Sequence, residues 1–329
     1  MSKKIIAKLF NYASREGAKK LIIEGKAQDL ALHYHFPDGE ERRFSLPKKI
    51  EKNLSQAIRE ILALAPDELT AKKYCKVEDK NYRLNFYLTI VPTSEGEKII
   101  INIIPQNDKK FGLKQLGLQK NDLLSLQKAL RHPSGLIILS SPAEQGKSTV
   151  LSSLITELNT PERSLYFLGA STKNKINGLN TLTETRSNWE KVLTIDSDII
   201  FAEMTDSANL DLAVRAASTG RLAVITMSAQ SVWEVLLNYL KLKLPLRLKL
   251  DSLKLILNSR IAPLKTDKRG QIGLFEVLVL SQKIKKFISE AAGDGPKKLF
   301  WEKLSRLALK EGYEPLSFDH QKKIKNGLL

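Results

Sequence analysis

One short stretch, residues 136–149, restricts the possible folds of this chain more than any other feature. It reads Leu-Ile-Ile-Leu-Ser-Ser-Pro-Ala-Glu-Gln-Gly-Lys-Ser-Thr. The apolar run at its start is typical of a buried parallel strand, and leucine and isoleucine recur at helical spacing over residues 151–158. A strand, a loop ending in Gly-Lys-Ser-Thr and a helix are the context that a phosphate-binding loop requires.

The chemistry of such a loop gives each residue at its end a role. Successive backbone N–H groups surround the β-phosphate, the lysine places a charge near the terminal phosphates, and the hydroxyl ligates Mg²⁺. The sequence therefore predicts a nucleotide site at Ser141, Gly146, Lys147, Ser148 and Thr149. The alternative is that Gly-Lys-Ser is an ordinary solvated turn. The strand before it and the helix after it favour the nucleotide site.

Two positions of the loop depart from the strict pattern. Ser141 stands where that pattern has glycine, and Glu144 stands where many such loops have a second one. Glycine permits positive φ and a close approach of phosphate. Glu144 instead brings a carboxylate toward the anionic oxygens of the ligand. We expect this side chain to turn away from the phosphates or to weaken nucleotide binding.

The length and composition indicate two domains of ordinary size. The chain has 329 residues, of which 42% are hydrophobic, enough for a core in each domain. Its one cysteine, Cys75, excludes a disulfide framework or a cysteine zinc site within the chain. The histidines are scattered along the sequence, so we expect no metal site made by protein groups alone.

The chain is strongly basic, with 53 Lys and Arg residues against 36 acidic ones and a formal net charge of +17. This charge favours an anionic partner, which could be nucleic acid, an acidic protein surface or the inner face of a membrane. A lysine-rich solvated surface explains it equally well. Because no tract combines arginines with aromatic residues, nucleic acid is the least favoured partner.

The distribution of charge also bears on location. Lys8, Asn11 and Arg15 interrupt the apolar start of the chain, which argues against a signal peptide. No uncharged stretch approaches the ~20 residues of a membrane span. We expect a cytoplasmic protein, either free or peripheral at the inner face of the cell membrane.

A polar, aperiodic segment near residue 107 divides the chain, and the fold class expected overall is α/β. Residues 1–106 are predicted to form a small α+β domain, and residues 107–112 a linker. Residues 113–329 alternate between strands and helices, as in a parallel sheet covered by helices, and turn mostly helical after residue 232. The expected strands lie at 20–23, 30–36, 82–91, 98–104, 136–139, 165–168, 199–202 and 222–226, with helices at 5–16, 50–64 and 208–218.

Further motifs occur in a fixed order along the chain. Residues 199–206 read Ile-Ile-Phe-Ala-Glu-Met-Thr-Asp, and an alanine-rich helix and Ala-Ser-Thr-Gly-Arg at 217–221 follow. Leu-Lys-Gln-Leu-Gly-Leu at 113–118, Pro-Thr-Ser-Glu-Gly-Glu at 92–97 and Arg-Gly-Gln-Ile-Gly-Leu-Phe-Glu-Val-Leu at 269–278 complete the set. Together they resemble the motor ATPases of type II secretion and type IV pilus assembly. The likeness extends over nearly the whole chain.

The resemblance implies a RecA-like P-loop NTPase domain with a helical C-terminal part, and ATP and Mg²⁺ as cofactors. It also implies a homomeric or mixed hexameric ring with paralogous ATPases that works on an inner-membrane pilus or secretion platform protein. Around the Mg²⁺ ion, Glu203 and Asp206 would join Ser148. Glu203 is the remaining candidate for a catalytic carboxylate.

Other catalytic positions of the family are altered here. Gly169 and Ala170 stand where the family has a Glu-Asp pair that polarises the attacking water, Thr205 replaces an arginine and Ser228 replaces a histidine. Charge stabilisation of the transferred phosphoryl group accounts for orders of magnitude in rate. We therefore expect ATP binding with weak or absent hydrolysis. An active motor and a basic nucleic-acid-binding module are the alternatives.

Overall fold

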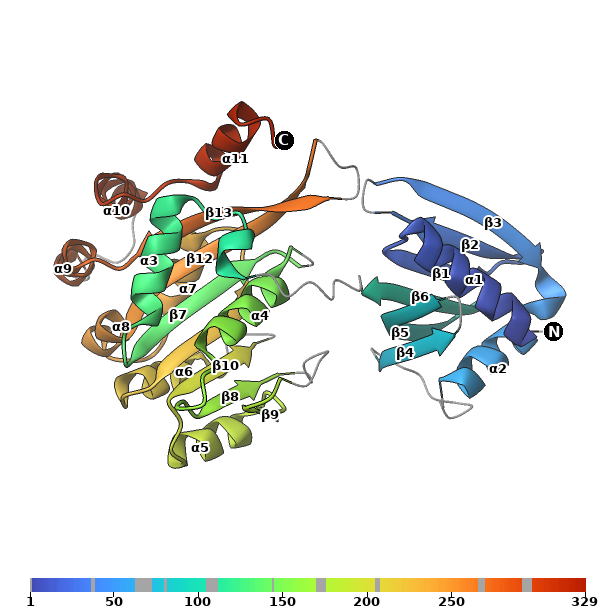
Figure 1. The fold of residues 1–329 in the computed structure, drawn as a ribbon, viewed down its shortest axis with the longest axis horizontal. Coiled ribbons are helices and arrows are strands. Elements are labelled where there is room, and N and C mark those ends of the chain that lie inside the picture. The colour runs from blue at the N-terminus through green and yellow to red at the C-terminus, as the bar shows by residue number, and fades with distance from the viewer. Residues whose placement is uncertain are drawn as a thin grey trace. The chain divides into compact units, whose positions relative to one another are not determined.

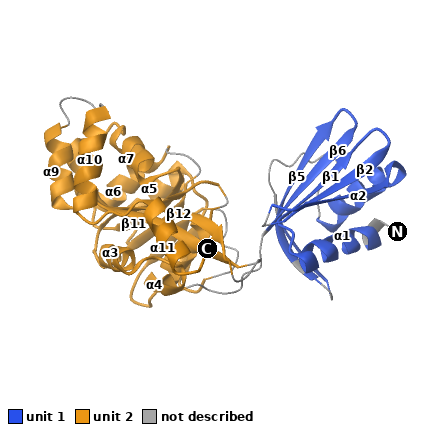
Figure 2. Cartoon of the chain, turned by 90° about the horizontal axis from the view of Figure 1, so that it is seen from above, with its two compact units in different colours: residues 1–109 blue, residues 110–329 orange. Residues whose placement is uncertain are grey.

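The chain forms two compact units, residues 1–109 and 110–329 (Figure 2). Each unit has a hydrophobic core of its own. The computed structural model describes residues 2–36, 39–62, 73–79, 82–104, 112–143, 145–169, 176–204, 208–265, 270–291 and 298–329.

The first unit is built on an antiparallel sheet of six strands in the order β3-β2-β1-β6-β5-β4, and buried residues of α1 and α2 share a core with it (Figure 1). Buried and half-buried residues alternate along β1 and β2. This is the pattern of a sheet with one face against a core. The elements are α1 (Ser2–Glu16), β1 (Lys20–Gly25), β2 (Asp29–His35), β3 (Glu41–Pro47), α2 (Glu51–Ile61), β4 (Lys73–Asp79), β5 (Tyr82–Thr93) and β6 (Gly96–Ile104).

The second unit is built on a sheet of seven strands in the order β13-β12-β7-β11-β10-β8-β9. All neighbours pair in parallel except β13, which is antiparallel to β12. The strands are β7 (Gly135–Ser141), β8 (Leu165–Leu168), β9 (Leu179–Leu182), β10 (Ile199–Glu203), β11 (Leu222–Ser228), β12 (Leu253–Pro263) and β13 (Gln271–Val279).

Helices cover both faces of this second sheet (Figure 1). Helices α3 and α4 share one core cluster with it, and α5 to α10 contribute to the other. Because both of its faces are covered, β7 is buried along its whole length, which explains its unbroken apolar run. The helices are α3 (Lys120–Leu130), α4 (Lys147–Leu158), α5 (Arg186–Thr194), α6 (Leu210–Ser218), α7 (Val232–Leu240), α8 (Leu246–Ser252), α9 (Gln282–Ala291), α10 (Lys298–Lys310) and α11 (Leu316–Lys325).

A buried ion pair fixes the last helix to the sheet. On α11, the Lys323 ammonium lies 2.6 Å from the Asp319 carboxylate, and both side chains are almost fully buried. Asp319 also accepts the backbone N–H of Phe275 on β13 at 2.8 Å. The C-terminal helix is therefore part of the second unit's packed structure. Among the described residues, no helix is both long and apolar enough to span a membrane.

Candidate nucleotide site

The carboxyl ends of three neighbouring parallel strands meet beside the start of α4. Ser141 ends β7, Ser228 ends β11 and Glu203 ends β10, and Ser228 lies opposite Ser141 in the register. In sheets of this kind, ligands bind outside the carboxyl ends of the strands. The topology thus brings the predicted loop, Glu203 and the altered histidine position together.

Gly146 gives the loop the turn that starts α4. It has φ of +86°, in the left-handed region, and precedes the first helical residue. A Cβ atom built on Gly146 would lie 3.1 Å from Cδ1 of Ile261 on β12. The neighbouring Gln145 accepts the backbone N–H of Ile261 through its Oε1 at 2.8 Å. Positive φ and close packing therefore both favour glycine at position 146.

The amino end of α4 is open to an anion. Within the described part of the loop and helix, no side chain caps this end and no acidic residue lies in the first turn. Free N–H groups and the helix dipole make such an end a binding site for phosphate. Thr149, the last predicted site residue, lies in this turn, and its own N–H bonds to the Gly146 carbonyl at 3.0 Å.

Lys147 is folded back over the loop. Its Nζ donates to the backbone carbonyls of Ser141 at 2.8 Å and Pro142 at 3.3 Å, and to Oγ of Ser228 at 3.2 Å. Burial lowers the pKa of Lys147, and the negative charge of Glu203 opposes that shift. The ammonium group is held among neutral oxygens at the place where a phosphate charge would be favourable.

The two predicted Mg²⁺ ligands are already in contact. The hydroxyl of Ser148 donates to Oε1 of Glu203 at 2.8 Å. A hydroxyl and a carboxylate are hard oxygen donors of the kind that Mg²⁺ takes in nucleotide sites. The residues present therefore fit a nucleoside triphosphate with Mg²⁺: an open helix end, a lysine and an adjoining pair of oxygen ligands.

Ser141 enters the site through its backbone alone. Its side chain is fully buried, and its hydroxyl donates to the carbonyl of Pro142 at 2.8 Å. Its own carbonyl accepts Lys147. A direct contact between the Ser141 hydroxyl and a phosphate would require this short local bond to break.

The end of β8 leaves no room for the acid that the family resemblance places there. Gly169 is buried next to Glu203, and its N–H bonds to the Leu182 carbonyl at 2.8 Å. A Cβ atom on Gly169 would lie 2.6 Å from Cζ of Phe167 and 3.2 Å from Cβ of Glu203. The contact with Phe167 is too short for a real Cβ atom, and the contact with Glu203 is tight. The packing around position 169 therefore fits glycine better than an acid.

The structure does not describe four of the positions named above as parts of the loop or the family motifs: Glu144, Ala170, Thr205 and Asp206. The role expected for Asp206 near Mg²⁺ thus stays a prediction. Over the described ranges, no group of three or more His, Cys, Asp or Glu residues could hold a metal ion by itself.

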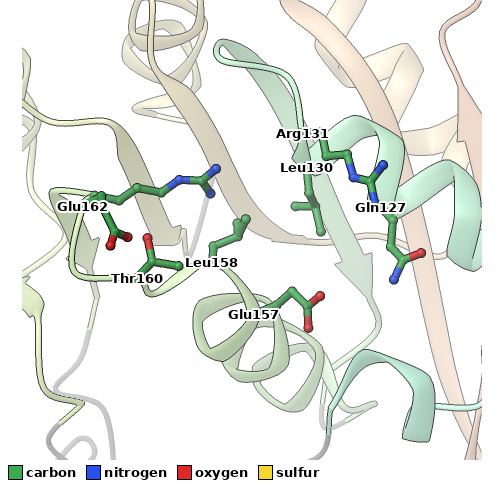
Figure 3. Close-up of a pocket in the computed structure, with 8 residues that line it drawn as sticks. Gln127, Leu130, Arg131, Glu157, Leu158, Thr160 and Glu162 are labelled. Atoms are coloured by element: carbon green, nitrogen blue, oxygen red, sulfur yellow. The ribbon is translucent and has the colours of Figure 1, made fainter.

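A pocket of about 390 Å³ lies at the other end of α4 (Figure 3). Its lining comes from the ends of α3 and α4 and from the segment that follows α4. Since α4 has 12 residues, the pocket lies roughly 15 Å or more from the loop. It has no part in the nucleotide site. The lining residues are Gln127, Leu130, Arg131, Glu157, Leu158, Thr160, Glu162 and Arg163.

The fold and the loop together have the architecture of a P-loop protein, with a mostly parallel, helix-covered sheet. A family model described as "Type II/IV secretion system protein" matches residues 2–327. The chain belongs to this family, which confirms the relationship that the ordered motifs predicted.

The curated relatives of this chain have low sequence identity to it and are longer proteins. The chain is 24% identical over 239 residues to "Putative type II secretion system protein E" of Escherichia coli, covering 69% of this chain and 48% of that protein. It is 25% identical over 191 residues to "Type IV pilus assembly ATPase PilB" of Pseudomonas aeruginosa, covering 56% and 34%. The chain spans about half or less of the length of these relatives.

Solved structures share the fold over nearly the full chain. The ATPase DotB of Legionella pneumophila superposes with a TM-score of 0.75 at 16% identity, covering 99% of this chain and 92% of that one. The pilus retraction motor PilT, solved with bound ADP, gives 0.69 at 18% identity, covering 98% and 93%. The predicted fold class, a small α+β domain before a RecA-like domain with a helical C-terminal part, is confirmed.

Proposed function

We propose that this chain binds ATP with Mg²⁺ as a subunit of a secretion or pilus ATPase, and that it hydrolyses ATP slowly or not at all. The observation that carries the binding proposal is the 2.8 Å hydrogen bond between Ser148 and Glu203, made directly below the open end of α4. It brings two proposed Mg²⁺ ligands together near a lysine whose ammonium donates to three neutral oxygens.

The residues divide the work of binding. The backbone N–H groups from Gly146 to Ser148 receive the phosphates, and Lys147 exchanges its bonds to the loop carbonyls for bonds to the terminal phosphates. Ser148 and Glu203 would hold the Mg²⁺ ion, and Asp206 is expected to join them. Mg²⁺ supplies charge neutralisation between the β- and γ-phosphates.

We expect slow hydrolysis because Gly169 and Ser228 replace catalytic groups of the family beside the proposed ligands. Gly169 provides no carboxylate to orient an attacking water, and its packing against Phe167 excludes one. Ser228 bonds to Lys147 with a neutral hydroxyl where the family has an imidazole. In an active site of this type, one acid helps to hold Mg²⁺ and another orients the attacking water. Here Glu203 would have to do both.

The proposed partners follow from the family and are expectations for the whole protein. We propose a homomeric or mixed ring with paralogous ATPases, located at the inner face of a membrane beside a platform protein of the pilus or secretion apparatus. The names of the relatives, a type II secretion protein and a pilus assembly ATPase, support this proposal.

Titration of the purified chain with a fluorescent ATP analogue and Mg²⁺ tests the binding proposal. We expect Lys147→Ala to weaken binding at least about tenfold, since it removes the charge that faces the phosphates. Lys128→Ala, on the exposed side of α3, is the matched control and should bind as the wild type does. Equal affinity of Lys147→Ala and wild type would show that the nucleotide, if any, binds elsewhere.

The proposal that this chain hydrolyses ATP slowly or not at all is tested by a phosphate-release assay. The same preparations are assayed alone and mixed with paralogous ATPases of the same cell. Release that occurs only in the mixture and persists with Lys147→Ala would assign the chemistry to the paralogues. This result would leave the present chain as a ring subunit.

A further inference from the structure

Cationic side chains gather on the second unit at the end of the sheet opposite the nucleotide site. Lys254 follows the first residue of β12 and packs along Gly135, the first residue of β7, whereas the phosphate-binding loop follows the last residue of β7. Helices α8 and α9 lie next to each other there (Figure 1). The basic surface consists of Lys241, Lys243, Arg247, Lys254, Lys285 and Lys286.

In the turn between α7 and α8, the cationic side chains are exposed and the leucines between them are half-buried. Residues 241–248 read Lys-Leu-Lys-Leu-Pro-Leu-Arg-Leu, with the leucines half-buried against the core and Lys241, Lys243 and Arg247 exposed. The buried Lys249 holds this turn by donating to the Leu242 carbonyl at 3.0 Å. The side chain of Arg247 is 94% exposed. Leucine packing therefore holds the backbone while the charges project outward.

Helix α9 adds further positive charge at the edge of this turn. Burial, followed by the nearby charge of Lys254, lowers the pKa of Lys285 to about 8. Lys286, on the same helix, is 76% exposed. Among the described residues, the carboxylates that form ion pairs with this surface are Asp251, with Arg247, and Glu290, with Lys286. Like charges are thus held together without a matching number of acids, which produces a positive potential at the surface.

We propose that the basic surface adsorbs to the anionic lipid headgroups of a bilayer. Five of its six cations are lysines, which act as mobile point charges and suit a fluid layer of headgroups more than the bidentate recognition that arginine provides. Half-buried leucines between the cations suit the boundary between headgroups and water. The turn itself, residues 241–248, contains no aromatic residue on which bases could stack, and Phe287, next to Lys286, is stacked on Phe300. This arrangement disfavours single-stranded nucleic acid.

This adsorption directs the nucleotide site away from the lipid, because the two lie at opposite ends of the same parallel strands. The inference does not depend on nucleotide binding, because the basic surface lies at the starts of β7 and β12 and the phosphate-binding loop follows the end of β7. Each exposed cation near an anionic bilayer contributes about fivefold to the binding constant.

Co-sedimentation of the full chain with vesicles tests the proposal. Vesicles of phosphatidylglycerol and phosphatidylcholine in equal parts are compared with vesicles of phosphatidylcholine alone. We expect binding to the anionic vesicles only, reversed by high salt. The combined variant Lys241→Glu, Lys243→Glu, Arg247→Glu should bind about a hundredfold more weakly or worse.

The control carries the same change of charge on the other face of the sheet, as Lys114→Glu, Lys120→Glu, Lys128→Glu, all exposed residues. It should retain most of the binding, and both variants should melt as the wild type does. Equal losses in the two variants would show that net charge alone drives adsorption and would overturn the proposal. So would the absence of vesicle binding, or a shift of generic DNA that exceeds vesicle binding and is lost in the first variant only.

Discussion

Ser148, at the start of α4, and Glu203, at the end of β10, are joined by a 2.8 Å hydrogen bond although 55 positions separate them in the sequence. The contact depends on the parallel order β7-β11-β10, which places both residues at one edge of the sheet. A Mg²⁺ ion can be held here by small rotations of two side chains. In the proposed function, these two oxygen ligands are therefore adjacent before the nucleotide binds.

This contact predicts how Mg²⁺ dependence should respond to mutation. Ser148→Ala removes one metal ligand and leaves Lys147 and the helix end intact, so the variant should bind the nucleotide with little or no enhancement by Mg²⁺. The affinity for an ATP analogue is measured with Mg²⁺ and with EDTA. Ser152→Ala, one turn further along α4 and exposed, serves as the control and should keep the enhancement. A full Mg²⁺ effect in Ser148→Ala would move the metal away from this residue.

The packing of Gly169 predicts that the lost acid cannot simply be restored. In Gly169→Glu, the new Cβ atom meets the ring of Phe167 and Glu203, so we expect a loss of about 1–3 kcal/mol in the free energy of unfolding and no gain in phosphate release. Gly169→Ala should show a similar loss, since the clash begins at Cβ. Denaturant unfolding of both variants provides the measurement. A stable Gly169→Glu protein that releases phosphate rapidly would show that β8 can shift and that this position alone restricts the rate.

Much of the fold could be predicted from the sequence, because strands buried on both faces read as apolar runs. The runs at 136–139, 165–168, 199–202 and 222–226 are the cores of β7, β8, β10 and β11. Strands β12 and β13 were not predicted, since residues after 232 were interpreted as mostly helical. A short, mostly apolar segment such as Leu253–Leu257 fits a buried helix or a buried strand equally well, and only pairing with β7 decides between them.

For the candidate site, the sequence indicated the residue types but not their contacts. The bond between Lys147 and Ser228 requires the register of β7 and β11, and that between Gln145 and the Ile261 N–H requires β12 to lie beside β7. The clash at Gly169 depends on the rotamer of Phe167. Such relations are set by tertiary packing and carry no local sequence signal.

A buried carboxyl in α3 predicts how stability changes with pH. Burial, followed by the nearby charges of Glu314 and Asp319, raises the pKa of Asp122 to about 7. In the unfolded chain an aspartate titrates near ~3.9, so between about pH 4 and pH 7 the unfolded state loses its proton first. The folded state is therefore destabilised as pH rises through this range.

Asp122→Asn removes this titration, so the variant should be more stable than wild type at pH 8, by about 2 kcal/mol, and its advantage should shrink toward pH 5. Asp122 lies in the first turn of α3, where the helix dipole favours the carboxylate and offsets part of the cost of its burial. Urea unfolding at several pH values gives the difference. Asp251 is an exposed acid, so the free energy of unfolding of Asp251→Asn should change with pH as that of the wild type does. A constant difference between Asp122→Asn and wild type would assign the pH dependence to other groups.

The strongest expectation concerns the rate of hydrolysis. With Gly169 in place of an acid and Ser228 in place of an imidazole, two parts of the transition-state environment are absent, and each such part accounts for orders of magnitude in rate in related enzymes. We expect the isolated chain to release phosphate very slowly while it binds ATP. Any residual rate should depend on Glu203, the carboxylate closest to the bound metal.

Glu203→Gln tests this dependence, because an amide still accepts the hydrogen bond of Ser148 but neither accepts a proton from water nor offers a charge to Mg²⁺. The variant should lose the residual phosphate release and keep nucleotide binding in the absence of Mg²⁺. Phosphate release in single-turnover assays and analogue binding are measured on the same preparation, with Lys147→Ala as the non-binding reference. Rapid release by the wild type that disappears with Lys147→Ala would instead identify this chain as a working motor subunit, with its water-activating group outside the positions compared here.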